Sequence, residues 1–287
     1  MLARQLLKAT WTCRMGGFGL ASYPLILFSI GGLGSLAQGQ SQVPQALPAL
    51  VDQNPSQGAN KNGDKPDGPE RWNLFYQATS VGQYHGTFRS PYSGTFSLQD
   101  YAERDASLTT TLFFGLRLNR NTAVYFDPEI AGGRGFSGID GLANSSNGEL
   151  PRVASATPKP YLARLYVSHD FGFGSEKESF ESEANQLAGE RPMNRYTITA
   201  GRFTLTDFFD NNRYSHDPRT QFLGWGVMFN GAWDYPADVR GYTWGWVHEF
   251  HTHSWSFRYA SAAMPRVANG LRFDRRLFRN RGDVVEG

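Results

Sequence analysis

The sequence predicts an all-β protein whose strands pair in antiparallel order. Three observations support this prediction. Apolar and polar side chains alternate with a period of two in several runs of about ten residues. Tight turns separate some of these runs, as in β-hairpins. No convincing helical pattern follows the N-terminal leader, and no later stretch has the ~20 consecutive apolar residues of a membrane-spanning helix.

The clearest hairpin runs from Ser107 to Ile130. One face of its first run carries Leu108, Thr110, Leu112, Phe114, Leu116 and Leu118. The other face carries Ser107, Thr109, Thr111, Phe113, Gly115 and Arg117. A tight turn at 118–121 follows. In the return run one face carries Val124, Phe126, Pro128 and Ile130, and the other carries Tyr125, Asp127 and Glu129.

The first 37 residues predict a secretory signal peptide. Three basic residues, Arg4, Lys8 and Arg14, precede an apolar stretch, and small residues at Ser35 and Ala37 predict cleavage after Ala37. An uncleaved anchor helix is the alternative. The leader holds three of the 28 basic residues, none of the 26 acidic residues and the only cysteine. A mature chain would therefore be near neutral, with no support for nucleic-acid binding from charge, no disulfide framework and no zinc–thiolate site.

Residues 38–70 are rich in Pro, Gln, Asn, Gly and Ser, which predicts a flexible segment. The strand pattern then occupies 71–287. We expect about eight strands, at 71–79, 107–118, 122–130, 161–170, 196–201, 223–229, 242–249 and 254–259. Long loops are expected at 85–105, 132–159 and 206–221, and the charged stretch 172–193 is expected to be a solvated connection.

The two faces of these strands favour a transmembrane barrel over a soluble all-β protein. The apolar rows carry bulky rings, often near strand ends, as in the aromatic belts of membrane barrels. These rings are Trp225, Trp244, Trp246, Trp255, Phe257 and Tyr259. The opposite rows carry charges of both signs, which suits a water-filled lumen. These charges are Arg117, Asp127, Glu129, Arg164, Asp170, Glu249 and Arg258.

An aqueous channel needs about 16 strands, roughly twice the number expected here. Residues 272–281 indicate a basic connection, Gly282 and Asp283 a turn, and Val284 the start of another strand. The expectation is a truncated chain that holds about half of a larger barrel.

Four segments resemble the carbohydrate-selective porins of the OprB family. They are Arg89–Gly94, Asn185–Gly189, Phe209–Arg219 and Asp234–Asp238, within a resemblance that covers Glu70–Gly287. The resemblance implies a ~16-stranded porin β-barrel in the outer membrane of a Gram-negative bacterium, through which sugars diffuse passively. It implies mono- or oligosaccharides, outer-membrane lipid, lipopolysaccharide and the barrel-assembly machinery as partners, with a possible homo-oligomer. The family's C-terminal strands are missing from this chain. Some relatives serve divalent cations such as manganese, which leaves a cation porin as an alternative, beside a non-conducting barrel and a soluble secreted β protein.

A sugar pore needs carboxylates and guanidinium groups for hydroxyls, and flat rings for C–H faces. The expected lining residues are Arg117, Tyr125, Asp127, Glu129, Arg164, Tyr166, Asp170 and Arg258. The loop after 206 could narrow the pore through Asp207, Asp210, Asn211, Asn212, Arg213, Asp217 and Arg219. The alternatives are a lining that only balances charge and a loop locked by its own ion pairs.

Two further patterns are weaker. His251 and His253 lie two apart and could bind a metal, but a His-Thr-His turn is more often solvated. Asp127 and Glu129 on one strand would not flank a glycosidic bond from opposite faces. We therefore predict no metal, no cofactor and no enzymatic activity.

Overall fold

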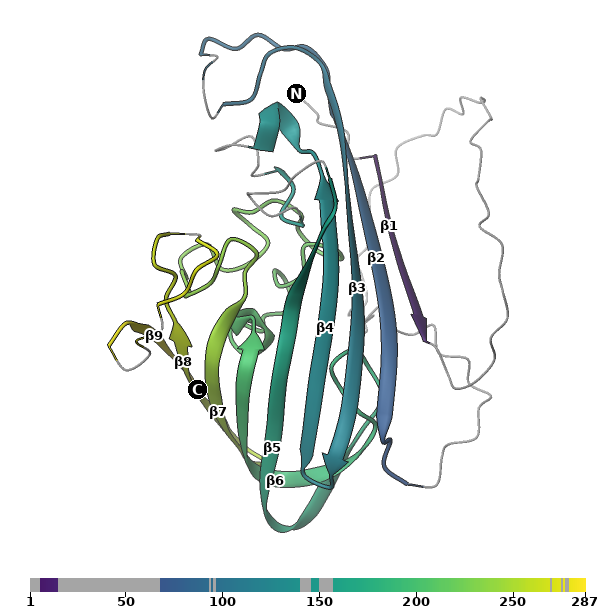
Figure 1. Ribbon diagram of the computed structural model, residues 1–287, viewed down its shortest axis with the longest axis vertical. Coiled ribbons are helices and arrows are strands. Elements are labelled where there is room, and N and C mark those ends of the chain that lie inside the picture. The colour runs from purple at the N-terminus through teal and green to yellow at the C-terminus, as the bar shows by residue number, and fades with distance from the viewer. Residues whose placement is uncertain are drawn as a thin grey trace, which may run out of the picture. The chain divides into compact units, whose positions relative to one another are not determined.

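The computed structural model describes residues 6–14, 68–92, 94, 97–139, 146–149, 157–268, 270–274, 276 and 279–287. This part of the chain forms one nine-stranded antiparallel sheet whose strands follow chain order (Figure 1). The strands are β1 (Leu6–Arg14), β2 (Trp72–His85), β3 (Glu103–Asn119), β4 (Thr122–Gly133), β5 (Lys159–Phe180), β6 (Gly189–Phe203), β7 (Thr243–His251), β8 (Ser256–Ala263) and β9 (Arg281–Glu286). The structure also contains two short 3₁₀ turns, Phe136–Ile139 and Leu205–Asp207. The all-β antiparallel prediction is confirmed, and the sheet is open, with β1 and β9 at its edges.

The predicted hairpin is the pair β3–β4, and both strands extend beyond the expected bounds. Phe114 lies opposite Phe126, and Gly115 opposite Tyr125, which matches the predicted faces. The Asn119 side chain accepts a hydrogen bond from the backbone N–H of Asn121 at 2.9 Å and stabilises the turn. Consecutive antiparallel connections alternate between the two ends of a sheet, so this turn and the one between β7 and β8 share an end (Figure 1). The long connections after β2, β4 and β6 lie at the other end.

The sheet buries its polar row and exposes its apolar row. On β3, Thr109 and Thr111 are 3% and 2% exposed, whereas Leu108 and Leu112, which flank them, are 47% and 41% exposed. The same inversion occurs on β4, where Asp127 and Glu129 are buried and Phe126 and Ile130 are exposed. An antiparallel sheet of a soluble protein packs its apolar face on the core and leaves its polar face to water. This sheet therefore has the opposite polarity.

A small apolar core lies on the covered polar face, under the long connection between β6 and β7. It consists of Tyr125, Tyr166, Leu187, Phe203, Leu205, Phe209, Val247, Ala260 and Ala262. On β8 the covered positions carry the small residues Ala260 and Ala262, and the β6–β7 connection supplies the larger Leu205 and Phe209. The connection is thus packed against the sheet by burial of apolar surface.

Three expectations about strands are wrong. Residues 223–229 form no strand, because glycines at 224, 226 and 231 break the run and the N–H of Val227 turns back to the carbonyl of Gly224 at 3.0 Å. The solvated connection 172–193 is largely strand, since β5 continues to Phe180 and β6 begins at Gly189. Gly282 and Asp283 lie within β9, opposite Ala262 and Ser261, and not in a turn.

A bulge in β5 changes one predicted face. Strict alternation along 161–170 would place Tyr161 on the apolar row with Leu165 and Val167. The β4–β5 ladder shifts register between Asp127 and Pro128, and Tyr161 pairs with Glu129 while Arg164 pairs with Asp127. One extra residue in the bulged strand turns the following side chains to the other face. Tyr161 and Arg164 therefore share the covered polar face.

The N-terminal predictions lie mainly outside the described residues. These include most of the signal peptide 1–37 and the flexible segment 38–70 up to residue 67. The structure places Leu6–Arg14, which the sequence assigns to the leader, as strand β1 antiparallel to β2, with Thr10 opposite Thr79. The signal peptide itself stays a prediction.

Candidate functional site

Two segments cover the polar face of the sheet. One is the long connection between β6 and β7, residues 204–242, and the other is the tip of the β5–β6 hairpin, residues 181–188. Figure 1 shows the β5–β6 hairpin curving at the end of the sheet that carries the β3–β4 turn. The hairpin tip then contacts β2, β3 and β4 through hydrogen bonds of residues far apart in sequence.

Asp127 and Arg164 form the centre of this face, as their positions on adjacent strands predict. Arg164 donates two hydrogen bonds to the carboxylate of Asp207, from Nε at 2.7 Å and from Nη2 at 2.6 Å. Its Nη1 lies 3.3 Å from Oδ2 of Asp127, which also accepts a hydrogen bond from the side chain of Asn185 at 2.9 Å. A planar guanidinium bound at two carboxylates fixes the geometry more firmly than a single contact. Asp207, expected in a constriction loop, is thereby attached to the sheet.

The other predicted lining residues also lie on the covered face. Glu129 accepts a hydrogen bond from the Thr111 hydroxyl at 2.7 Å. Tyr125 and Tyr166 are buried, with ring centroids 5.1 Å apart. Nearer to the turns, Asp170 accepts two hydrogen bonds from Arg191 at 2.7 Å each.

Two more predicted lining residues, both arginines, have carboxylate or carbonyl partners. Arg258 bonds Glu249 at 3.1 Å and Glu286 at 2.8 Å. Arg117 donates to backbone carbonyls, including that of Glu70 at 2.9 Å. The charges of this face are therefore balanced by local partners of opposite sign or by backbone dipoles.

The predicted constriction loop combines the two alternatives that the sequence left open. Arg219 reaches the sheet, with Nε 2.9 Å from Glu149 and Nη1 2.6 Å from the Gln77 side chain on β2. Asp217, Asp210 and Asn212 accept hydrogen bonds from nearby backbone N–H groups and build the turns of the loop itself. The remaining expected residues, Asn211 and Arg213, are exposed. The loop is locked by its own bonds and also lies across the polar face.

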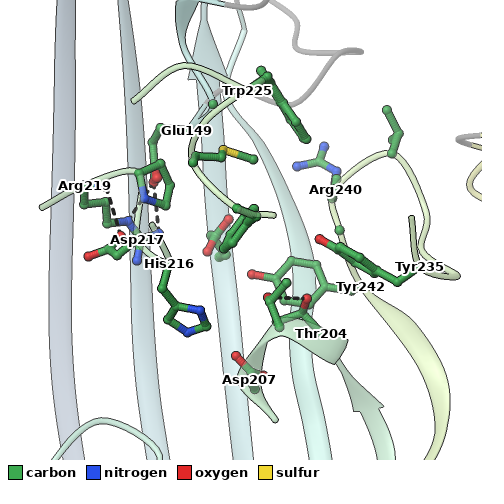
Figure 2. Close-up of a pocket in the computed structure, with 18 of the residues that line it drawn as sticks. Glu149, Thr204, Asp207, His216, Asp217, Arg219, Trp225, Tyr235, Arg240 and Tyr242 are labelled. Atoms are coloured by element: carbon green, nitrogen blue, oxygen red, sulfur yellow. Dashed lines mark hydrogen bonds and ion pairs between the residues drawn. The ribbon is translucent and has the colours of Figure 1, made fainter. Parts of the chain in front are cut away.

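A cavity of about 300 Å³ lies between this loop and the covered face at β4 and β5 (Figure 2). Its wall combines aromatic rings with charged groups. The residues that matter most to its chemistry are Glu129, Tyr161, Arg164, Asp207, Arg219, Trp225, Tyr235, Arg240 and Tyr242. Its volume is at the lower end of the range for small-molecule sites, about 300–1,000 Å³.

Two hydrogen-bond donors at this cavity are buried without a partner among the described residues. They are Nε1 of Trp225 and Nη1 of Arg240. The Arg240 guanidinium also stacks on the ring of Tyr161, with its central carbon 3.7 Å from the ring centroid. An unsatisfied buried donor costs about 1–3 kcal/mol, so both groups favour a bound acceptor such as a hydroxyl oxygen or water.

Burial dominates the electrostatics of the loop residues around the cavity. It raises the pKa of Glu149, and the nearby Arg219 guanidinium only partly offsets this effect. It also raises the pKa of Tyr235 to about 12, although hydrogen bonds to Thr204 and Thr206 oppose the shift. Both phenol and carboxyl are therefore held nearer to their neutral forms than they would be in water.

Sequence reasoning missed several residues of this cavity. Glu149 and Arg240 come from loops and carried no pattern signal. Trp225 was placed on the expected strand 223–229, which the structure does not form. Strict alternation would place Tyr242 on the apolar row with Trp244 and Trp246, but Tyr242 is buried at the cavity. The Asp234–Asp238 segment was among those that resemble the porins. Its Asp238 accepts a hydrogen bond from Nη2 of Arg202 on β6 at 2.6 Å.

The histidines near the β7–β8 turn do not form one cluster. His248 lies on the exposed face, and its Nδ1 shares a hydrogen bond with the Tyr196 hydroxyl at 2.6 Å. His253 lies in the turn, where its backbone N–H contacts the Asn194 side chain. In the part of the chain that the structure describes, no three His, Cys, Asp or Glu residues are grouped as a metal site. The same part of the chain has no helix with the length and hydropathy of a membrane span.

Comparison of this chain with protein-family models, curated proteins and solved structures finds no match. The resemblance to the carbohydrate-selective porins therefore stays a prediction.

Proposed function

We propose that this protein is an outer-membrane porin that lets carbohydrates diffuse through a water-filled β-barrel. The observation that carries the proposal is the inverted polarity of the sheet. Its buried row holds Thr109, Asp127 and Glu129, whereas its exposed row holds Leu108, Phe126 and Ile130. A sheet with this pattern suits lipid on its apolar side and water on its polar side.

The exposed face also has the rings that a membrane interface favours. A stacked row crosses four strands, from Phe171 on β5 through Tyr196 and His248 to Tyr259 on β8, with successive centroids 5.9–6.0 Å apart where they stack. Phe250 stacks on Trp255 in the adjoining β7–β8 turn. Amphipathic rings gathered near one end of a sheet are typical of the aromatic belts at headgroup depth.

The covered face has the chemistry of a sugar path. Several of its charges are paired, as in Arg164 with Asp207 and Arg219 with Glu149, so the path offers hydrogen bonds without a strong field of either sign. The cavity adds aromatic faces and the two unpartnered donors of Trp225 and Arg240. Sugar hydroxyls accept such hydrogen bonds, and C–H faces pack on rings. We therefore assign the cavity as the sugar-contacting part of the path.

The proposal requires that the open edges of β1 and β9 are paired in the membrane, because lipid offers no partner for backbone N–H and C=O groups. A bilayer experiment on the purified protein tests the proposal. The purified protein should shift in gel mobility on heating and give channels whose conductance falls when saccharide is added. Recovery in the aqueous periplasmic fraction would refute the proposal in favour of a soluble β protein. Conductance that ignores saccharides and responds to Mn²⁺ would refute the substrate and favour a cation porin.

A further inference from the structure

The tip of the β5–β6 hairpin, residues 181–188, is folded back onto the covered face instead of projecting from the end of the sheet. Asn73 on β2 donates hydrogen bonds to the carbonyl of Gln186 at 2.7 Å and to the Ser182 hydroxyl at 3.1 Å. Glu70, just before β2, accepts hydrogen bonds from the Ser182 hydroxyl at 2.9 Å and from the backbone N–H of Ala188 at 2.8 Å. These contacts join residues more than 100 positions apart, so they fix the tip to the sheet.

A third residue clamps the same assembly from β3. Arg117 donates from Nε to the carbonyl of Glu70 at 2.9 Å and from Nη2 to the carbonyl of Ala188 at 3.1 Å. One guanidinium thus binds both the segment before β2 and the end of the tip. Hydrogen bonds from a charged donor are stronger than neutral ones, and the two acceptors hold the arginine in one orientation.

The tip also meets the β6–β7 loop at one carboxylate. Asn185 has a φ of +60°, in the left-handed region that asparagine tolerates, and this turn directs its amide to Asp127 at 2.9 Å. Asp127 is bound in addition by Arg164, which holds Asp207 of the loop. The loop enters from the end of β6 opposite to the hairpin, so the tip binds Asp127 from one end of the sheet and the loop is linked to Asp127 through Arg164 from the other.

Little space remains between the tip and its surroundings. A cavity of about 140 Å³ lies there, lined by Asn185 and Leu187 of the tip, Tyr125 and Tyr166 of the sheet and Phe208 of the loop. Leu187 is buried in the same apolar core as Leu205 and Phe209. The tip therefore narrows the polar face at a level distinct from the larger cavity beneath the loop.

From this geometry we propose that the hairpin tip forms a second constriction, which limits the size of solute that passes the polar face. The inference rests on the proposed function, because a constriction matters only to a protein that conducts. Solutes are then selected twice, once at the cavity under the β6–β7 loop and once at the tip. Asn73, Arg117 and Asn185 are the residues that hold the second constriction in place.

The first test removes the tip from the protein. Phe180 and Gly189 lie opposite each other in the ladder, so an Asn-Gly turn can join them in place of residues 181–188. Single-channel conductance should rise about two-fold or more. A trisaccharide that is too large to enter the parent channel should enter the variant channel and block its conductance. The matched control is Lys177→Ala, because Lys177 pairs with Glu190 on the solvent side of the same hairpin and leaves the tip intact. If the parent conducts and is blocked by saccharides, but the shortened variant has the same conductance as the parent, the constriction is overturned and the proposed function is not. A parent that does not conduct would overturn the proposed function, and the constriction with it.

A second test does not depend on conduction or on folding of the shortened variant. The double variant Asn73→Cys with Ser182→Cys, made in a Cys13→Ser background, replaces two side chains that touch at 3.1 Å. These cysteines should form a disulfide in membrane-inserted, heat-modifiable protein. The pair Asn73→Cys with Lys177→Cys should not cross-link. Inserted protein in which the first pair remains reduced under oxidising conditions would overturn the placement of the tip.

Discussion

Arg164 provides the sharpest test of the site, because it neutralises a carboxylate that has no access to solvent. The Asp127 side chain is 0% exposed, and its charged partner is Arg164. Replacing Arg164 by alanine leaves Asp127 with the neutral amide of Asn185 as its remaining side-chain partner. Breaking a buried ion pair in this way costs about 3–5 kcal/mol. Asp207 is 25% exposed and recovers water, so its loss adds less.

We therefore expect Arg164→Ala to lower the free energy of unfolding by about 3 kcal/mol. Urea titration of refolded protein in detergent or vesicles, followed by tryptophan fluorescence, measures this value. The rescue variant is Arg164→Ala with Asp127→Asn, which removes the buried charge and keeps an acceptor for Asn185. It should recover most of the loss. The control is Lys177→Ala, whose pair with Glu190 is 61% and 60% exposed and should contribute about 0–1 kcal/mol. A loss for Arg164→Ala no larger than the control, or no rescue by Asp127→Asn, would refute the reasoning.

Three other predictions concern the exposed face, the loop and the cavity. Leu112→Arg should cost about 2–4 kcal/mol of unfolding free energy in vesicles if Leu112 faces lipid, and a change within about 0.5 kcal/mol would indicate water there instead. The folded-state pKa of Glu149 is raised by burial, so its ionisation opposes folding above that pKa and the penalty is relieved as pH falls. As the pH falls from 7 to 4.5, the urea concentration at the unfolding midpoint should therefore rise for the parent relative to Glu149→Gln. Midpoints that change in parallel with pH would contradict this. Trp225→Phe keeps a ring and removes one unpartnered donor, so the half-blocking saccharide concentration should rise by about 2- to 10-fold; an unchanged value would remove Trp225 from the sugar path.

Period-two alternation predicted the hairpin β3–β4 and its faces because it is a local property of extended backbone. It also placed Asp127 and Arg164 on the same side of neighbouring strands, where the structure joins them at 3.3 Å. The short turn at 118–121 fixes the register of β3 with β4. The connection from β4 to β5 is long, so the sequence predicted the shared face of Asp127 and Arg164 but not their register. This part of the candidate site was therefore accessible from the sequence.

Two misses have local causes. The bulge in β5 adds one residue without any change in the chemical pattern, so alternation alone places Tyr161 on the wrong face. The run that contains Trp225 and Val227 has a strand-like alternation, but its glycines indicate a turn-rich loop. The glycine spacing was the available signal. The positions of Glu149 and Arg240 depend on tertiary packing of loops, which no local pattern encodes.

The miss at residues 181–188 has a different cause, since polarity was taken to mean exposure. That rule holds when the covered face of a sheet is apolar. Here the covered face is polar, so a polar segment finds partners on it, as Ser182 and Asn185 do with Asn73 and Asp127. The charges of the hairpin arms, such as Lys177, remain exposed because they point away from that face. In a sheet of inverted polarity, the segments that fold inward are those with short hydrogen-bonding side chains, and charge density alone does not identify them.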